Sequence, residues 1–291
     1  MKLSELFSRK EPTLSFEVFP PKTDAKYESV KEATNSIAEL KPDFMSVTYG
    51  AGGGTSQYTV SIAADILKNH GVTPLAHLTC LASSREKVFS QLDALKENGI
   101  ENILALRGDR PKDETQIQTD YKYASQLVRE IKEYGDFCVG GACYPEHHVE
   151  SINSVDDIKH LKEKVDMGCD FLTTQMFFDN NILYSFLYKI REAGITVPIV
   201  AGIMPVTNVK QIQRSCELSG TYLPQRFKSI ADRFGDNPLA MKQAGIAYAT
   251  EQIIDLLANG VNAIHVYSMN RPDVAKQIQD NLSYIIPKRD I

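Results

Sequence analysis

The stretch LALRGDRP, Leu104–Pro111, is a place where a buried strand ends in charged residues. Its first residues continue an apolar run of strand length, and Pro111, which lacks a backbone N–H, prevents further regular pairing. Arg107 and Asp109 stand two residues apart, so on an extended chain their side chains face the same side. Gly108 between them lets another backbone or a flat ligand come close. The pattern indicates a binding site, although a solvated turn in which the two charges neutralise one another would have the same sequence.

Apolar runs of strand length recur along the chain, and this recurrence favours the binding-site interpretation. The eight predicted strands are Leu14–Pro20, Asp43–Gly50, Thr73–Cys80, Asn102–Asp109, Phe137–Pro145, Asp170–Phe178, Pro198–Pro205 and Asn262–Met269. Amphipathic helical patterns separate them. Short apolar strands that alternate with helices require a parallel sheet covered on both faces. The count of eight favours a closed (β/α)8 barrel over an open doubly wound sheet.

Capping residues place several of the intervening helices. Asp24 is the predicted N-cap of the helix after the first strand, and Ser83 or Ser84 caps the helix after the third. An extra helical stretch precedes the eighth strand and spans about Asn208–Ala258, with a break at Asn237–Pro238. No linker or low-complexity segment interrupts the chain, so residues 1–291 are expected to form one barrel domain.

The composition favours a small-molecule enzyme of the cytoplasm. The net charge of -5 argues against nucleic acid or a membrane surface as a partner, since such binders usually carry a basic field. The five cysteines are an odd number without CxxC spacing, which indicates reduced core thiols. We find no apolar signal-peptide core and no run of some 18 apolar residues.

In a (β/α)8 barrel the loops after the strands build the site, and here those positions are polar. They carry Glu17, Thr48, His77, Arg107, Asp109, Tyr144, His147, His148, Gln175, Tyr267 and Arg271. On the first strand Leu14, Phe16 and Val18 share one apolar face that suits the helix layer, so Glu17 should point into the barrel mouth.

A partly desolvated carboxyl group without a cationic partner has a raised pKa and can donate a proton to a substrate. The alternative is a structural ion pair between Glu17 and a neighbouring arginine.

Other motifs are less specific. Three consecutive glycines, Gly52–Gly54, follow the second strand without the GK[ST] of a P-loop, and they suit either a mobile connection or close approach to a cofactor. The pair His147 and His148 lacks the HxxxH or HxH spacing of metal ligands, so we expect no metal. No strand ends in a lysine placed for a Schiff base, because Lys22 lies beyond two prolines.

Eight strings at the ends of the eight strands resemble the methylenetetrahydrofolate reductase family in order and spacing. They are SFEVFPPK (15–22), VTYGAGG (47–53), HLTC (77–80), LALRGDRP (104–111), YPEHH (144–148), TQMFFD (174–179), GIMPV (202–206) and YSMNR (267–271). The resemblance spans nearly the whole chain and corresponds to the bacterial type, without the regulatory C-terminal domain of eukaryotic members.

The resemblance implies an FAD-dependent oxidoreductase of one-carbon metabolism and methionine biosynthesis. Such an enzyme takes hydride from NADH or NADPH and reduces 5,10-methylenetetrahydrofolate to 5-methyltetrahydrofolate. A homo-oligomer is expected. Because the methylene bridge must open to a cationic iminium, an acid is needed at the leaving nitrogen, and the resemblance assigns that role to Glu17.

The remaining roles also come from the resemblance. Asp109 corresponds to a carboxylate near the flavin that favours the developing cation, and Gln175 to an amide that contacts folate. Further folate contacts correspond to Gln211, Tyr267 and Arg271, the last of which suits a carboxylate tail. Flavin-binding positions correspond to Thr48, His77, Arg107, Gly108, Asp109, Ala142, Tyr144, His148, Asp157, His160 and Lys164.

Three positions depart from the family pattern. Glu163 stands where some members have an arginine, His160 where they have an asparagine, and Ser215 where one has an aromatic ring that packs on the nicotinamide. Two other classes stay open: a pterin-binding methyltransferase barrel, which needs no flavin, and a ligand-binding barrel without catalysis.

Overall fold

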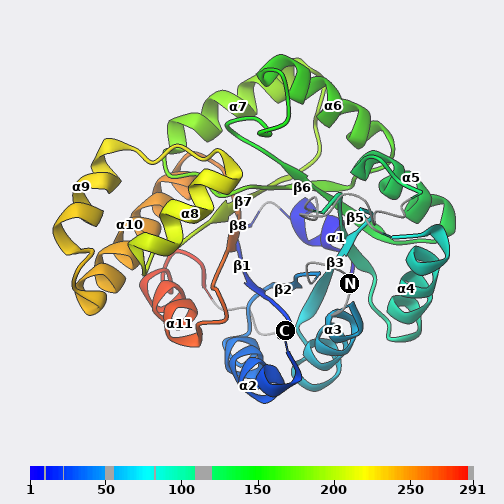
Figure 1. Ribbon diagram of the computed structural model, residues 1–291, viewed down its shortest axis with the longest axis horizontal. Helices are drawn as coiled ribbons and strands as arrows, with labels where there is room; N and C mark the ends of the chain where they lie inside the picture. The colour runs from blue at the N-terminus through cyan, green and yellow to red at the C-terminus, as the bar shows by residue number, and fades with distance from the viewer. Residues whose placement is uncertain (10, 22, 50–55, 82, 109–119, 288–291) are drawn as a thin grey trace.

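The computed structural model describes residues 1–291 except 10, 22, 50–55, 82, 109–119 and 288–291. Its strands close into a barrel in sequence order, each parallel to the next, and β8 pairs with β1 through Thr13 opposite Ala263. The strands are β1 (Thr13–Val18), β2 (Phe44–Val47), β3 (Thr73–Thr79), β4 (Asn102–Leu106), β5 (Cys138–Cys143), β6 (Phe171–Thr174), β7 (Ile199–Ile203) and β8 (Ala263–Val266). The predicted (β/α)8 barrel is confirmed (Figure 1).

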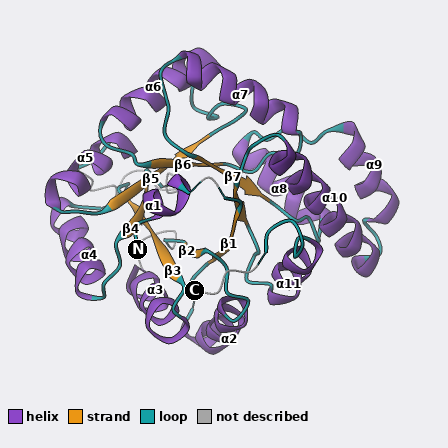
Figure 2. Cartoon of the chain, turned by 180° about the vertical axis from the view of Figure 1, so that it is seen from behind, coloured by secondary structure: helices purple, strands orange, loops and turns teal. Residues whose placement is uncertain are grey.

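Helices form the outer ring of the barrel (Figure 2). They are η1 (Asp24–Lys26), α2 (Tyr27–Ala38), α3 (Ser56–His70), α4 (Arg85–Glu97), α5 (Ala124–Tyr134), α6 (Ser154–Asp166), α7 (Asn180–Glu192), α8 (Val209–Ser219), α9 (Gln225–Phe234), α10 (Pro238–Ala258) and α11 (Pro272–Asn281). A further short helix, α1 (Leu3–Ser8), lies elsewhere and is described below.

Of the two capping predictions one is right and one is wrong, and the predicted break before α10 is confirmed. Ser84 caps α4 by accepting from the N–H of Lys87, and Asn237 caps α10 at the predicted break. Asp24 does not cap a helix, because it is the first residue of the 3-10 turn η1. The extra helical stretch has a second break that we did not predict, between α8 and α9, where Gly220 adopts a left-handed conformation with φ 70°.

The barrel wall alternates strictly between an outer and an inner face, as period-two strands require. Leu14, Phe16 and Val18 of β1 are buried in the apolar layer between strands and helices, as predicted. The inner face changes character along the barrel axis. Phe44, Leu75, Leu104, Cys138, Phe171, Val200 and Ala263 form an apolar floor near the strand N-termini, and polar side chains follow above them.

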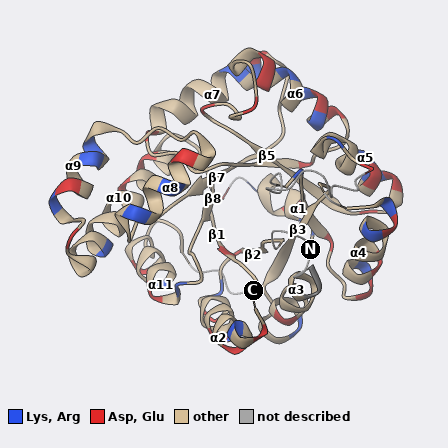
Figure 3. Cartoon of the chain, viewed as in Figure 1, with Lys and Arg blue, Asp and Glu red and all other residues tan. Residues whose placement is uncertain are grey.

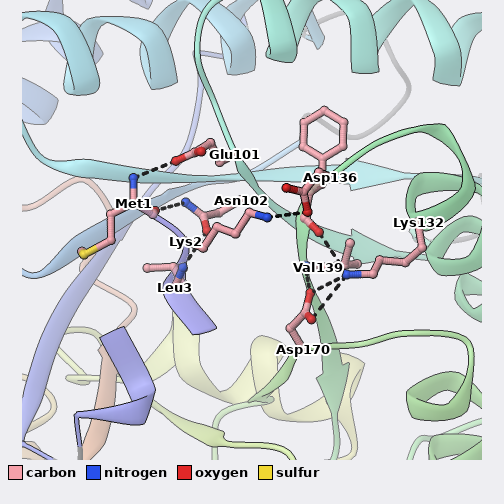
Figure 4. A network of polar contacts seen from close by, with 10 residues as sticks. Met1, Lys2, Leu3, Glu101, Asn102, Lys132, Asp136, Val139 and Asp170 are labelled. Carbon is pink, nitrogen blue, oxygen red and sulfur yellow. Dashed lines mark hydrogen bonds and ion pairs between the residues drawn. The ribbon is translucent and has the colours of Figure 1, made fainter. Parts of the chain in front are cut away.

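Helix α1 covers the N-terminal end of the barrel, inside the ring of strands in Figure 1. Leu3 and Leu6 are buried against the apolar floor, and the Phe7 ring packs edge-on against Phe44 and Phe171. Polar contacts hold the segment in place (Figure 4): the N–H of Leu3 donates to Asn102 at 2.8 Å, and Lys2 pairs with Asp136 at 2.5 Å. The barrel is therefore closed at one end.

Lys and Arg residues alternate with Asp and Glu residues along the outer helices (Figure 3). None of the described helices is long and apolar enough to cross a membrane.

Candidate active site

A cavity of about 1040 Å³ opens at the C-terminal ends of the strands. Most of the predicted site residues line it, although they come from seven strands or the segments that follow them. They are Glu17, Thr48, His77, Arg107, Gly108, Ala142, Tyr144, His148, Asp157, His160, Lys164, Gln175 and Tyr267. This is the position at which (β/α)8 barrels carry their active sites.

Glu17 points from β1 into this cavity, as the alternation predicted. Its side chain keeps 17% exposure, and its nearest ionisable neighbour is His77, with Nε2 at 3.8 Å from Oε2. Among the described residues no arginine or lysine pairs with it, so the alternative of an Arg–Glu ion pair is wrong for this part of the chain. Burial raises the pKa of Glu17 to about 8, and a hydrogen bond with Ser46 opposes that shift. Glu17 is thus mostly a neutral acid at pH 7.

His77 lies beside Glu17 on the cavity wall and is almost fully buried. Burial lowers its pKa to about 3, so the ring is neutral at physiological pH. Its Nε2 atom is buried without a hydrogen-bond partner. Because buried polar atoms are normally paired, this nitrogen is free to bond a polar atom of a ligand.

Two cationic side chains, Arg107 and Lys164, lie on the cavity wall, together with the carboxylates of Glu150 and Asp157. The Arg107 guanidinium forms a two-pronged pair with Glu150, both contacts at 2.7 Å, which raises the pKa of Arg107. The Lys164 ammonium donates to the carbonyl of Ala142. Gly108, next to Arg107, has φ +88° and so requires the freedom of glycine. Arginine and lysine side chains on a cavity wall suit the phosphates of a nucleotide cofactor.

Tyr144 and His148 also line the cavity, with their rings edge to face at 4.7 Å. Asp157 accepts a hydrogen bond from Ser151 at 2.7 Å, and His160 lies 3.8 Å from Asp156.

Gln175 and Tyr267 form another part of the wall. The Gln175 side chain accepts from the N–H of Met176 at 2.9 Å, and the Tyr267 hydroxyl donates to the carbonyl of Thr174 at 2.6 Å. Gly202 makes room for that tyrosine, because a Cβ there would lie 2.4 Å from its hydroxyl oxygen.

Two predicted substrate residues do not line the cavity. Arg271 precedes α11, where it donates to Thr207 at 2.9 Å and pairs with Asp273 at 3.1 Å. Gln211 is exposed in the first turn of α8, which the Asn208 side chain caps by accepting from the Gln211 N–H. Since Thr207 and Asn208 are adjacent, the two residues belong to neighbouring segments. Asp109 and the glycines Gly52–Gly54 lie outside the described residues.

Sequence reasoning missed two features of the site. Glu150 pairs with Arg107. The only signal for this in the sequence is that Glu150 follows the fifth strand, which neighbours the strand that precedes Arg107. His265 lies on the inner face of β8, two residues before Tyr267, and the period-two alternation could have found it.

A closed barrel with a polar, acid-containing cavity at the carboxyl ends of its strands defines the class of (β/α)8-barrel enzymes. Residues 2–283 match the family profile described as methylenetetrahydrofolate reductase. The chain therefore belongs to the methylenetetrahydrofolate reductase family, as the strand-end motifs predicted.

Individual relatives agree. A 5,10-methylenetetrahydrofolate reductase from Pectobacterium carotovorum subsp. carotovorum is 36% identical, over 91% of this chain and 88% of the relative. Methylenetetrahydrofolate reductase (NADH) 1 from Zea mays is 37% identical, over 93% of this chain and 48% of the relative. The chain thus spans about half the length of the plant relatives it matches.

A solved structure supports the fold alone. It is described as an uncharacterized protein from Clostridium thermocellum that binds two copies of 5-methyl-5,6,7,8-tetrahydrofolic acid. Its TM-score is 0.65 at 13% identity, over 98% of this chain and all of the other.

Proposed function

We propose that this chain catalyses the flavin-dependent reduction of 5,10-methylenetetrahydrofolate to 5-methyltetrahydrofolate, with NADH or NADPH as the electron donor. The observation that carries the proposal is Glu17, a carboxyl group kept neutral by burial and directed into a large cavity. Family membership supports the reaction, because opening a methylene bridge between two nitrogens requires an acid at the nitrogen that leaves.

The cavity fits FAD, the cofactor we propose. Arg107 and Lys164 supply cations for a diphosphate, Gly108 lines the cavity wall beside them, and His77 offers an unpaired nitrogen. Thr48, Ala142, Tyr144, His148, Asp157 and His160 would complete this binding surface. When bound, FAD would supply the hydride-transfer chemistry between the nucleotide and the folate.

The chain's own residues prepare the folate. Glu17 gives its proton to the leaving nitrogen as the iminium forms, and Gln175 and Tyr267 orient the pterin ring from the cavity wall. Gln211 and Arg271 lie outside the cavity, where they would hold the part of the substrate that extends from it, with Arg271 on a carboxylate. We assign Asp109 to the flavin edge, where its charge would favour the developing cation.

We further propose that the protein acts in the cytoplasm as a homo-oligomer, since its family works on small soluble substrates. Size-exclusion chromatography with light scattering tests the assembly: a mass of one chain, 32.5 kDa, would refute it.

The colour of the purified protein tests the reaction. We expect a yellow protein whose flavin absorption is bleached by NADH or NADPH without oxygen and returns when 5,10-methylenetetrahydrofolate is added. A protein that stays colourless after incubation with FAD would refute the proposal. Binding of folate without bleaching would favour the methyltransferase or the non-catalytic barrel.

A further inference from the structure

The strand that carries Glu17 reaches further than its neighbour β8. Backbone pairing between β1 and β8 ends at Phe16 opposite Val266, whereas β1 itself continues to Val18. Glu17 and the segment after it therefore extend past the last pair on this edge of the strand. Because backbone N–H and C=O groups in a folded chain are nearly always bonded, other groups must take the place of β8 here.

Side chains from the segment after β8 take that place. The Ser268 hydroxyl donates to the carbonyl of Glu17 at 2.7 Å. The Asn270 amide bonds both backbone groups of Phe19: its Oδ1 accepts from the N–H at 2.9 Å, and its Nδ2 donates to the carbonyl at 2.9 Å. A side-chain amide has the donor and the acceptor of a peptide unit, so Asn270 continues the ladder beyond the end of β8. We call these three hydrogen bonds the turn clamp.

A tight turn directs the two clamp side chains toward β1. The Arg271 N–H donates to the carbonyl of Ser268 at 3.0 Å, and the two residues between them, Met269 and Asn270, have φ of 55° and 52°. Two positive φ angles in succession are typical of a type I′ turn, which glycine, asparagine and aspartate dominate. Methionine is unusual at such a position, and left-handed residues of this kind persist where the surrounding structure holds them, often at active sites.

We propose that Ser268 and Asn270 are positioning residues, which hold the backbone at Glu17 so that its carboxyl group stays in register with the folate contacts made by Tyr267 and Arg271. The turn joins these groups directly, because Tyr267 precedes it and Arg271 ends it. This inference deepens the proposed function, on which it rests for the roles of Glu17, Tyr267 and Arg271. The hydrogen bonds of the clamp are independent of any activity.

The depth at which Glu17 is held also affects its acidity. The titratable groups near its carboxyl group are His77 on β3 and Tyr267 after β8. Burial keeps both neutral at physiological pH, because it lowers the pKa of His77 to about 3 and raises that of Tyr267. Burial is also the largest cause of the raised pKa of Glu17. A Glu17 side chain that moves toward the cavity mouth would gain water, and its pKa would fall.

Hydrogen exchange of the Phe19 amide, followed by nuclear magnetic resonance, tests the clamp without turnover. We expect this amide to be protected in the wild type, although it lies beyond the last β1–β8 pair. Asn270→Gly removes the amide side chain and keeps the turn, since glycine adopts positive φ without strain. Exchange at Phe19 should then be about tenfold faster, the scale of one lost hydrogen bond. An unprotected Phe19 amide in the wild type would overturn the proposal.

The same variant tests the effect on the acid. We expect Asn270→Gly to slow the folate half-reaction by about tenfold to a hundredfold, the scale of a misplaced catalytic group, while the nucleotide half-reaction keeps its rate. Infrared titration of the Glu17 carboxylic acid band, identified by its loss in Glu17→Gln, should show a lower pKa. Ser268→Ala, which removes the bond to the Glu17 carbonyl, should act in the same direction. Lys41→Gly is the matched control, because Lys41 is exposed, has φ 56° and precedes β2 at the other end of the barrel.

A merely structural role would lower stability without changing the pKa of Glu17 or the ratio of the two half-reaction rates. If Asn270→Gly leaves either of these at its wild-type value, or if Lys41→Gly changes them equally, the proposal is wrong even in an active enzyme. If the exchange and infrared results are as expected but the wild type never reduces the folate, the clamp stands and the proposed reaction fails.

Discussion

Glu17→Gln separates the two halves of the proposed reaction, because only one of them needs a proton. At pH 7 a pKa of about 8 leaves about 90% of Glu17 protonated, against about 0.3% at the ordinary value of 4.5. Burial thus increases the acid form roughly 300-fold. The glutamine keeps the shape of the side chain and removes this proton.

We expect the variant to fold, bind FAD and accept hydride from the nucleotide within about tenfold of the wild-type rate. Folate reduction should fall by about two to four orders of magnitude, the usual scale for a lost general acid. Stopped-flow absorbance of the flavin follows each half-reaction separately. Glu192→Gln, on the outer helix α7, is the control for a lost carboxylate far from the cavity. Equal losses in both half-reactions would mean that Glu17 is a structural or binding residue.

Three further predictions follow from charge and packing. The folded chain keeps the Glu17 proton up to about pH 8, whereas the unfolded chain loses it near pH 4.5. The stabilisation that comes from this proton is therefore fully present below pH 4.5 and is lost as the pH rises to about 8. The free energy of unfolding of the wild type, relative to that of Glu17→Gln, should fall by up to about 1.4 kcal/mol per pH unit as the pH rises from 5 to 8. Urea unfolding measures it at each pH, and an equal pH dependence of the two proteins would contradict this. Arg107→Ala should weaken FAD binding roughly tenfold to a hundredfold through loss of a charged hydrogen bond, measured by flavin fluorescence; an unchanged Kd would remove Arg107 from the cofactor site. Leu6→Ala should lower the free energy of unfolding by about 2–5 kcal/mol, since Leu6 is 2% exposed in the apolar floor; a loss below 1 kcal/mol would mean that α1 does not close the barrel.

The sequence predicted the architecture because strand-length apolar runs are local signals. It overran the strand ends: the fourth strand was predicted to reach Asp109, whereas β4 ends at Leu106. Polar residues after a strand do not reveal where pairing stops, because that depends on the neighbouring strand. Helix α1 escaped notice since it is short, and its two buried leucines pack against residues far along the chain.

The site was likewise predicted where the signal is local and missed where it depends on distant residues. Alternation along one strand placed Glu17 correctly, but the size of its pKa shift depends on burial by other strands. His265 looked ordinary in the sequence, because its partners Ser46 and Ser15 are 219 and 250 residues away. Asp109 stays a prediction.

Helix α1 packs against the apolar floor and closes the N-terminal end of the barrel, while the cavity opens at the C-terminal ends of the strands. In the proposed reaction the nucleotide and the folate would therefore reach Glu17 from the same side of the barrel. We expect the two substrates of the proposed reaction to bind one after the other. Steady-state rates measured against both substrates should then give parallel double-reciprocal lines, whereas intersecting lines would mean that both substrates occupy the cavity at the same time.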